Sequence, residues 1–287
     1  MVSPDFQLVQ LKNGSWSVRS VAEAETFHPV VGPVAEAEAL YVRQLQLAER
    51  FARHPEGEFV IWDVGLGAAA NVLTALKALR TLPGRLRVVS FDHTLKPLRF
   101  ALTHATELGY YGGYEAACEA LLAEADATFQ NGENQVRWQV QTGDFPTLLG
   151  TPAARLWPSP NAIFFDAYSP AKNMAMWTLP LFRQLHDRLD PAVPCTLATY
   201  SRATLLRVTL LLAGWYVGAG SATGEKEETT IAANSPDLLR QPLGCDWLER
   251  ARRSTSAEPM ITAVYRQMPL SPASAAALAA HPQFQSQ

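Results

Sequence analysis

The chain has 287 residues, of which 48% are hydrophobic and 18% charged, and its formal net charge is −3. This composition predicts a globular protein with a sizeable core and gives no overall attraction to nucleic acid. The sequence has no apolar run of about 18 residues and no secretory signal at its start, so we expect neither a membrane partner nor export. The three scattered cysteines, Cys118, Cys195 and Cys245, fit a reducing cytoplasm and indicate neither a disulfide framework nor a metal site.

Residues 1–54 precede the regular pattern and predict an N-terminal hairpin and helix, acting as a lid or an edge extension. Asn13-Gly14 is a strong hairpin turn signal, so two strands are expected within residues 7–20. Residues 21–33 predict a loop, and residues 34–54, rich in Ala, Glu, Leu and Gln, predict a helix. His28 in that loop could face a site from the lid, but a structural histidine is the favoured interpretation.

Strand-like and helical runs alternate over residues 55–270. Strands are expected at 58–62, 86–91, 136–141, 162–165 and 195–200, with an antiparallel pair at 215–218 and 229–233. Helical runs are expected at 68–82, 177–189 and 203–213, and residues 96–130 are expected to be helix-rich with a break at Gly109–Gly113. This alternation predicts an α/β, Rossmann-like domain with a mostly parallel, seven-stranded sheet and helices on both faces. The Ala-, Ser- and Pro-rich residues 271–287 are expected to form a flexible tail.

A glycine turn follows the first predicted strand. It reads Asp63-Val64-Gly65-Leu66-Gly67 and leads into a helical run. Gly65 and Gly67 would let a ligand approach the backbone, and the following helix N-terminus offers N–H groups to an anion. The alternative is a tight strand–helix turn without a ligand, because a short glycine turn alone is a weak signal.

Acidic residues end the next two predicted strands. Asp92 lies 25 residues beyond Gly67, where a carboxylate can accept hydrogen bonds from both ribose hydroxyls of a nucleotide-type ligand. Asp144 follows the third strand and could accept a hydrogen bond from an adenine amino group. It could equally be the N-cap of a helix that starts near Pro146.

The fourth predicted strand ends in the segment IFFDAYSPAKNMAMWT, residues 163–178. A buried strand that ends at Asp166 and continues into a polar loop is how open α/β sheets present chemistry at their carboxyl edge. Trp177, at the end of this segment, is expected in the core rather than in a ligand site. Together with the upstream strand ends, the order of features resembles that of class I S-adenosylmethionine-dependent methyltransferases.

Longer strings are similar to one family within that class. FFDAYSPAKNMAMWT resembles the methyltransferase half of the MnmC proteins, which complete 5-methylaminomethyl-2-thiouridine in tRNA. Further strings also match that family and occur in the same order along the chain: DVGLGAAAN, LATYS, AGWYV and GEKEETTIAA. The resemblance covers most of residues 11–233. Met174 stands where the family usually has Pro, and Ala68 and Ala69 replace residues that are more often Thr or Leu and Gly. These departures leave room for a divergent substrate.

The resemblance implies methyl transfer to the amine of 5-aminomethyl(2-thio)uridine at the tRNA wobble position, with tRNA as partner and S-adenosylmethionine as cofactor. It implies no flavin domain in this chain, because few residues follow position 233. The implied cofactor residues are Asp63, Gly65, Gly67, Asn71, Asp92, Asp144 and Asp166. Tyr168 could stack on the uridine, and Lys172 and Lys226 could meet phosphates, although each also has an ordinary surface role. The basic cluster Arg250, Arg252 and Arg253 fits a solvated helix face equally well.

Asp166 is the implied catalytic residue, and reference pKa values limit its ability to act as a base. An alkylammonium has a reference pKa near 10 against about 3.9 for Asp, and this gap is worth roughly 8 kcal/mol. Asp166 is therefore expected to position the amine by accepting its hydrogen bonds rather than to remove its proton; the alternative is that it only caps the loop. Two other functions stay open: methylation of a small amine or metabolite, which the acidic net charge favours, and cofactor binding without turnover.

Overall fold

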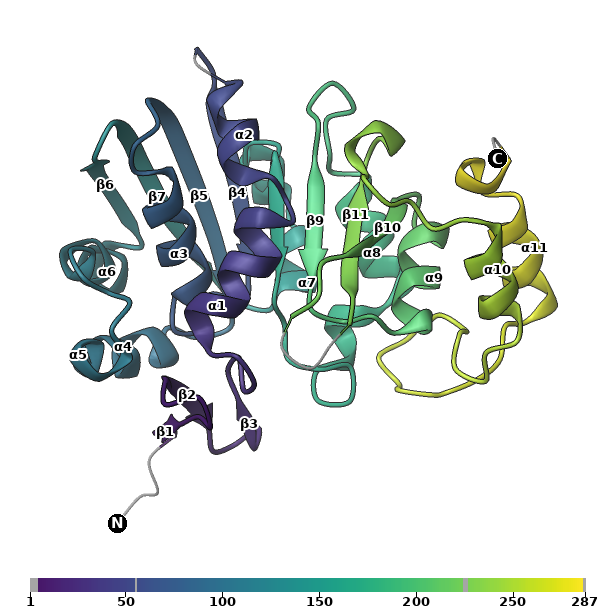
Figure 1. Ribbon diagram of the computed structural model, residues 1–287, viewed down its shortest axis with the longest axis horizontal. Coiled ribbons are helices and arrows are strands. Elements are labelled where there is room, and N and C mark those ends of the chain that lie inside the picture. The colour runs from purple at the N-terminus through teal and green to yellow at the C-terminus, as the bar shows by residue number, and fades with distance from the viewer. Residues whose placement is uncertain (1–4, 55, 224–226, 286–287) are drawn as a thin grey trace.

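A central eight-stranded sheet organises the computed structural model, which describes residues 5–54, 56–223 and 227–285 (Figure 1). The strands follow the order β10-β11-β9-β8-β4-β5-β7-β6. Five of them run parallel: β4 (Glu58–Val64), β5 (Gly84–Asp92), β7 (Asn134–Thr142), β8 (Ala162–Phe165) and β9 (Thr196–Thr199). The others are β6 (Asp126–Asn131), β10 (Tyr216–Gly220) and β11 (Thr229–Ala233), with β6 and β11 antiparallel to their inner neighbours.

Helices cover both faces of the sheet, as predicted. One face carries α1 (Pro33–Ala37), the π-helix η1 (Glu38–Arg43), α2 (Leu47–Ala52), α3 (Ala70–Leu79), α4 (Lys96–Thr103), α5 (Ala105–Leu108) and α6 (Glu115–Glu124). The other carries α7 (Phe145–Leu149), α8 (Leu179–His186), α9 (Thr204–Leu212), α10 (Cys245–Arg252) and α11 (Pro272–Ala279). Short 3-10 turns complete the fold: η2 (Pro152–Leu156), η3 (Met174–Trp177), η4 (Pro236–Leu238) and η5 (Pro282–Phe284).

The central strand β4 shows why the sheet is buried on both sides. Every residue after Glu58 in β4 is buried, and successive side chains enter opposite cores. Phe59 and Ile61 join the core with α3, whereas Val60 and Trp62 join the core with α8 and α9. A strand covered on both faces reads as a continuous apolar run, which is why β4 was recognisable in the sequence.

The strand order reverses at β4. The chain goes from β4 to β5 and β7 on one side and returns to β8 on the other. In open α/β sheets, ligands bind beyond the carboxyl ends of strands at such a reversal. Register brings Val64 of β4 level with Phe91 of β5 and Phe165 of β8, so the residues that follow these strands meet at one edge.

Two predicted helices differ from the structure. The expected helix 34–54 starts as α1, continues without a break as the π-helix η1, and is interrupted before α2, where Gln46 adopts a left-handed conformation with φ 51°. The expected helical run 96–130 ends instead in strand β6, which pairs antiparallel with β7 and adds an eighth strand. This edge strand has only part of its residues buried, and it directly follows an Ala- and Glu-rich helix, so the apolar pattern hid it.

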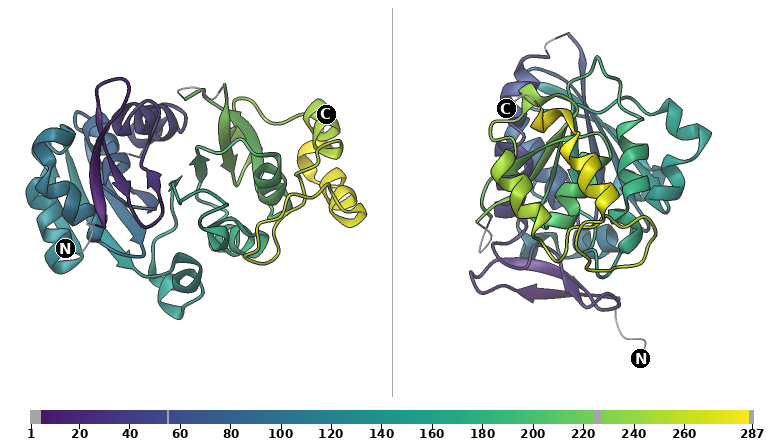
Figure 2. Two further views of the ribbon diagram at one scale, coloured as in Figure 1. Left: turned by 90° about the horizontal axis from the view of Figure 1, so that it is seen from below. Right: turned by 90° about the vertical axis from the view of Figure 1, so that its right-hand side faces the viewer.

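The predicted N-terminal hairpin is present and gains a third strand. β1 (Phe6–Gln10), β2 (Trp16–Ser20) and β3 (Glu25–Thr26) form an antiparallel sheet. The views in Figure 1 and Figure 2 place this small sheet below the carboxyl edge of the main sheet. It is attached there by the buried Val18 and by packing of Phe6 against Phe100 of α4, with ring centroids 6.0 Å apart.

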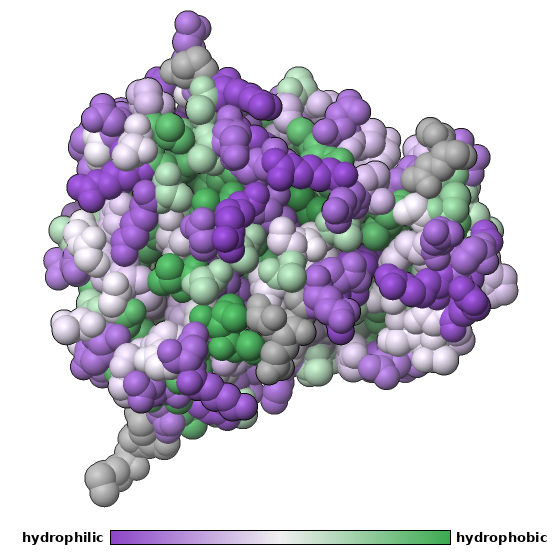
Figure 3. Space-filling model, viewed as in Figure 1, coloured by the Kyte–Doolittle hydropathy of each residue, from purple (hydrophilic) through white to green (hydrophobic). Residues whose placement is uncertain are grey.

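The face in Figure 3 is mostly hydrophilic, with a small hydrophobic area near the start of α1, where Val30 and Val34 are exposed. None of the described helices combines the length and apolar character of a membrane span.

The segment expected to be a flexible tail is folded over its described residues. Helix α11 packs on α9 (Figure 2). Leu278 and Phe284 are buried, and Phe284 stacks with Trp247 of α10. Gln283 makes three hydrogen bonds of 2.8 Å: its Oε1 accepts from Val217 N–H, and its Nε2 donates to the carbonyls of Val217 and Leu243. Such a side chain closes the segment onto strand β10.

We expect Gln283→Ala to lower the free energy of unfolding by about 2 kcal/mol, because it leaves buried backbone groups without partners. Urea denaturation monitored by circular dichroism measures this change. Gln285→Ala is the matched control, since its side chain is exposed and makes a single bond to Ala279. Equal effects from the two substitutions would contradict a structural role for Gln283.

Candidate active site

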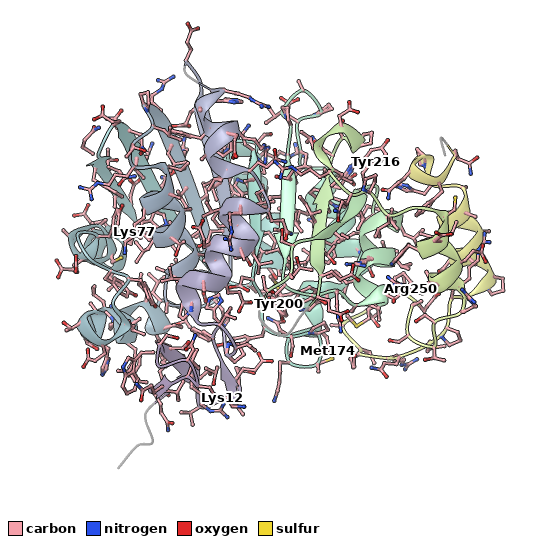
Figure 4. All side chains as sticks on the ribbon, in the orientation of Figure 1. Lys12, Lys77, Met174, Tyr200, Tyr216 and Arg250 are labelled. Carbon is pink, nitrogen blue, oxygen red and sulfur yellow. The ribbon has the colours of Figure 1, made fainter. Side chains whose placement is uncertain are left out.

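A cavity of about 950 Å³ lies at the carboxyl edge of the sheet, where the strand order reverses. Its walls come from the residues after β4, β5, β7 and β8, and the N-terminal segment around residues 19–31 lies over it. The size suits a nucleotide-type ligand, since small-molecule pockets span roughly 300–1,000 Å³. In Figure 4, Tyr200, which lines the cavity, and Met174 lie at the same edge of the sheet as the N-terminal hairpin.

The glycine turn after β4 forms one wall. Gly65 has φ 102°, and a Cβ placed on it would lie 2.6 Å from the carbonyl oxygen of Asp166. Only glycine therefore permits the loops after β4 and β8 to approach this closely. Ala69, just before α3, has φ 64°, a left-handed conformation that residues with a Cβ rarely adopt, so this turn carries some strain.

Asp92 links the end of β5 to the glycine turn. Its carboxylate accepts hydrogen bonds from the backbone N–H of Gly67 at 2.8 Å and of Thr94 at 3.2 Å. Burial raises its pKa, which these bonds partly oppose. A carboxylate has about four acceptor sites, so these two bonds leave capacity for ligand hydroxyls. Its location fits the predicted ribose contact, which stays a prediction.

Asp166 and Asn71 join opposite sides of the cavity. Asn71, in the first turn of α3, donates from Nδ2 to Asp166 Oδ2 at 2.7 Å. Burial raises the pKa of the Asp166 carboxyl, and the charge of a protonated His28 opposes that rise. The Asn71 Oδ1 is buried without a hydrogen-bond partner among the described residues. A bound ligand with an N–H or O–H donor would satisfy it, which supports the predicted role of Asn71 in cofactor binding.

His28 and Glu36 belong to the site, although the sequence favoured a structural role for His28 and did not single out Glu36. His28 Nε2 lies 3.6 Å from Asp166 Oδ2, and His28 Nδ1 lies 3.8 Å from Glu36 Oε2. Burial alone would lower the pKa of His28, but the two carboxylates outweigh it and raise the pKa overall. No local motif marks this arrangement; it arises because α1 packs beside the loop after β8.

The remaining predicted residues occupy different places. Asp144 caps α7 by accepting from the N–H of Thr147 at 3.1 Å, as one interpretation expected, and it also lines the cavity. Tyr168 lines the cavity and packs against Phe27, with ring centroids 5.9 Å apart; burial raises its pKa to about 12. Lys172 is exposed beyond the cavity lining, and Lys226 falls outside the described residues.

Asp63 lies beneath the cavity rather than in its lining. Its side chain is fully buried and accepts a hydrogen bond from Ser90 Oγ at 2.7 Å. Burial raises its pKa to about 7. Any contribution of Asp63 to ligand binding would therefore act through the backbone of the glycine turn that follows it.

Other residues behave as the sequence indicated. Trp177 is fully buried in the core. Arg250 lies 3.8 Å from Glu228, and Arg252 pairs with Glu249 within α10, which fits a solvated helix face. Met174 begins η3 and does not line the cavity, so the departure from Pro changes the loop rather than the wall.

Carboxylates outnumber cations in the described lining. The cations are Arg19 and Lys96, and the acidic residues are Asp5, Glu23, Glu25, Glu36, Asp92, Asp144 and Asp166. Such a lining favours a positively charged ligand. No cluster of metal-binding side chains occurs among the residues with assigned positions.

Comparisons with known proteins agree with this geometry. Residues 116–235 match a family model described as S-adenosyl-L-methionine-dependent methyltransferase. The chain is 29% identical over 237 residues to the tRNA 5-methylaminomethyl-2-thiouridine biosynthesis bifunctional protein MnmC of Aeromonas hydrophila, covering 76% of this chain and 34% of that protein. The corresponding protein of Methylibium petroleiphilum is 26% identical, with 83% and 36% covered. The chain thus spans about a third of the length of these relatives.

The fold is similar to the crystal structure of MNMC2 from Aquifex aeolicus, with a TM-score of 0.69 and 21% identity over 97% of this chain and 85% of that one. These matches confirm the predicted family resemblance and the Rossmann-like fold class. The description of the family model supports the expected methyltransferase activity and S-adenosylmethionine cofactor. The individual site residues remain predictions that the geometry supports to different degrees.

We expect Gly65→Ala to weaken S-adenosylmethionine binding at least tenfold, because its Cβ would push the Asp166 loop away. Isothermal titration calorimetry measures the dissociation constant. Gly109→Ala is the matched control: Gly109 also has positive φ, but its Cβ would meet nothing within 4 Å. Equal loss of affinity in both variants would show that general backbone strain, not the contact with Asp166, is responsible.

Asp63 predicts a pH dependence of stability. Its pKa of about 7 in the folded protein exceeds the usual value of about 3.9 for Asp, so the folded state holds the proton more tightly. Its contribution is complete below about pH 4 and is lost as the pH rises towards 7. We expect Asp63→Asn to remove this slope, about 1.4 kcal/mol per pH unit between pH 4 and 7. Urea denaturation of both proteins across this range tests it; parallel curves would contradict it.

Proposed function

We propose that this chain, an S-adenosylmethionine-dependent methyltransferase similar to the methyltransferase part of the MnmC proteins, methylates the amine of 5-aminomethyl(2-thio)uridine at the tRNA wobble position. The names of the similar proteins, which refer to biosynthesis of tRNA 5-methylaminomethyl-2-thiouridine, support this substrate. The tRNA as partner and the cytoplasm as location belong to the same proposal.

The observation that carries the proposal is the carboxylate of Asp166, only 14% exposed, inside a cavity whose acidic lining attracts cations. The hydrogen bond from Asn71 fixes this carboxylate, which can then accept hydrogen bonds from an amine. Bound S-adenosylmethionine supplies a methyl group on a positively charged sulfur. By aligning the amine nitrogen with that methyl group, Asp166 converts a bimolecular reaction into an oriented one, which accounts for several kcal/mol of the barrier.

The raised pKa of Asp166 does not make it an effective base for an alkylammonium. Burial moves the pKa of Asp166 upward and so narrows the gap to the amine. The reference gap of about 6 units is large, however, and Asn71 stabilises the charged carboxylate. Asp166 is therefore proposed to orient the amine, and a different group must take the proton.

The proposed cofactor-binding residues would contact different parts of S-adenosylmethionine. We propose that Gly65 and Gly67 hold the cofactor against the backbone, that Asp92 accepts from its ribose hydroxyls, and that Asp144 approaches the adenine. The orphaned Oδ1 of Asn71 would accept from a donor group of the same ligand. Asp63 would support the turn from below. On the substrate side, Tyr168 would stack on the uridine, with Lys172 and Lys226 near phosphates.

Methylation of a small cationic amine is the second candidate function. The predominance of carboxylates in the cavity lining favours a compact cation over a polyanionic RNA. Both candidates use the same catalytic arrangement and differ in what lies beyond the cavity mouth. They are separated by the substrate that receives the methyl group.

We expect labelled S-adenosylmethionine to transfer its methyl group to tRNA that lacks only the final methyl. Asp166→Asn is expected to lower kcat roughly 100-fold, because the amide cannot attract an ammonium group but can still accept from Asn71. Scintillation counting of purified tRNA measures this. Asp187→Asn is the matched control, because Asp187 is an exposed carboxylate at the end of α8.

Label absent from tRNA despite measured cofactor binding would refute the tRNA proposal, and transfer to a small primary amine would then favour the second candidate. Near-normal turnover of Asp166→Asn would refute the role of Asp166.

A further inference from the structure

His28 is held between two carboxylates at the cavity wall. Its imidazole lies 3.6 Å from Asp166, in the loop after β8, and 3.8 Å from Glu36, in α1. The side chains are nearly closed off from solvent, with 10% of His28, 10% of Glu36 and 14% of Asp166 exposed. We propose that His28 is the catalytic residue that takes the proton from the substrate ammonium before methylation, with Glu36 stabilising the resulting imidazolium. This inference rests on the proposed methylation of a primary amine.

The backbone around His28 is built to hold this position. His28 has φ 48°, a left-handed conformation that costs a non-glycine residue free energy and persists only where surrounding contacts require it. The preceding Phe27 is fixed to β2: its N–H donates to the carbonyl of Val18 at 2.8 Å, and its carbonyl accepts from Ser17 Oγ. The imidazole therefore reaches the cavity from a bend just after β3 that these hydrogen bonds of Phe27 tie to β2.

The groups that face His28 favour its charged form. Asp166 and Glu36 contact it from two different elements. Tyr41 of η1 and Tyr200 after β9 interact with the same two carboxylates, and Tyr200 also interacts with Glu25 of β3. Burial raises the pKa of both tyrosines well above the usual value, so these phenols stay neutral. The acids thus oppose the desolvation of His28 and raise its pKa.

His28 is a better match for the amine than Asp166. Reference pKa values place imidazole about 4 units and an Asp carboxyl roughly 6 units below an alkylammonium. The pKa of both His28 and Asp166 is raised in the folded protein, so the imidazole starts from the smaller gap. General bases work best when such gaps are small. The tautomer with hydrogen on Nδ1, which faces Glu36, leaves Nε2 to accept a proton on the Asp166 side.

The proposed reaction transfers one proton from the substrate to His28 and one methyl group from sulfur to nitrogen. The ammonium gives a proton to Nε2 of neutral His28 and becomes a neutral amine hydrogen-bonded to Asp166. The nitrogen lone pair then forms the new N–C bond while the C–S bond breaks, and the bonding pair stays on sulfur. The product is a secondary ammonium, and the imidazolium proton passes to water.

The pH dependence of kcat tests the proposal, with labelled transfer to tRNA as the assay. In the wild type, kcat should rise with pH and level off above the pKa of His28, because only neutral imidazole accepts a proton. His28→Gln should lower kcat about 100-fold at pH 7 and recover activity steadily towards the pKa of the amine. His186→Gln is the matched control, since His186 also lies beside a carboxylate, Asp187, but away from the cavity; its profile should equal that of the wild type.

Glu36→Gln provides a second readout that needs no cofactor or substrate. NMR titration of the imidazole resonances in the cofactor-free protein should give His28 a pKa above 6.5, and Glu36→Gln should lower it by removing a facing charge. In Glu36→Gln, the pH range over which kcat rises should move to lower pH by the same number of units as the pKa of His28.

The outcomes separate the two proposals. A wild-type protein that labels tRNA together with an unchanged His28→Gln profile would overturn the role of His28 and leave the proposed function standing. A His28 pKa that Glu36→Gln does not lower would overturn the role of Glu36 whatever the substrate is. Absence of label in tRNA, with the expected NMR titration, would overturn the substrate assignment; the pH profiles measured with a small primary amine would then decide on His28.

Discussion

The contact between the loops after β4 and β8 is the constraint on which the site depends. Gly65 approaches the Asp166 carbonyl so closely that no side chain fits between them, and Asn71 reaches the Asp166 carboxylate from the following helix. The two loops lie on opposite sides of the strand reversal. Their contact therefore fixes the distance between the half of the cavity proposed for the cofactor and the half proposed for the amine.

Buried carboxylates give this cavity its chemical character. Burial raises the pKa of Asp92 and Asp166 in the cavity lining and of Asp63 beneath it, so removing these acids from water costs the folded protein free energy. Shifted acids of this kind are common in functional sites, where the fold maintains charges that a ligand later neutralises. The positively charged sulfur of the cofactor and an ammonium substrate are both suited to that environment. His28 differs, because the same acids raise its affinity for a proton.

The sequence predicted the parallel strands and the acids at their ends, because central strands buried on both faces leave continuous apolar runs ending in recognisable turns. It did not predict β6, whose half-exposed residues follow a strong helical run, nor α11, whose small residues suggested disorder. The pairing of His28 with Glu36 and Asp166 was also hidden. These residues come together only through packing of the N-terminal segment against the sheet edge, and no spacing within the sequence encodes such a contact.

The hydrogen bonds of Gln283 also affect whether the edge strand β10 can pair with another copy of the chain. β10 is the outermost strand on its side of the sheet, and exposed edge strands offer unpaired backbone groups to other chains. Here the N–H of Ala219 donates to Gln241, the N–H of Leu243 donates to Val217, and the Gln283 amide pairs with Val217 as another strand would. The segment after β11 thus pairs backbone groups of β10 that another chain could otherwise bind, which opposes edge-to-edge aggregation.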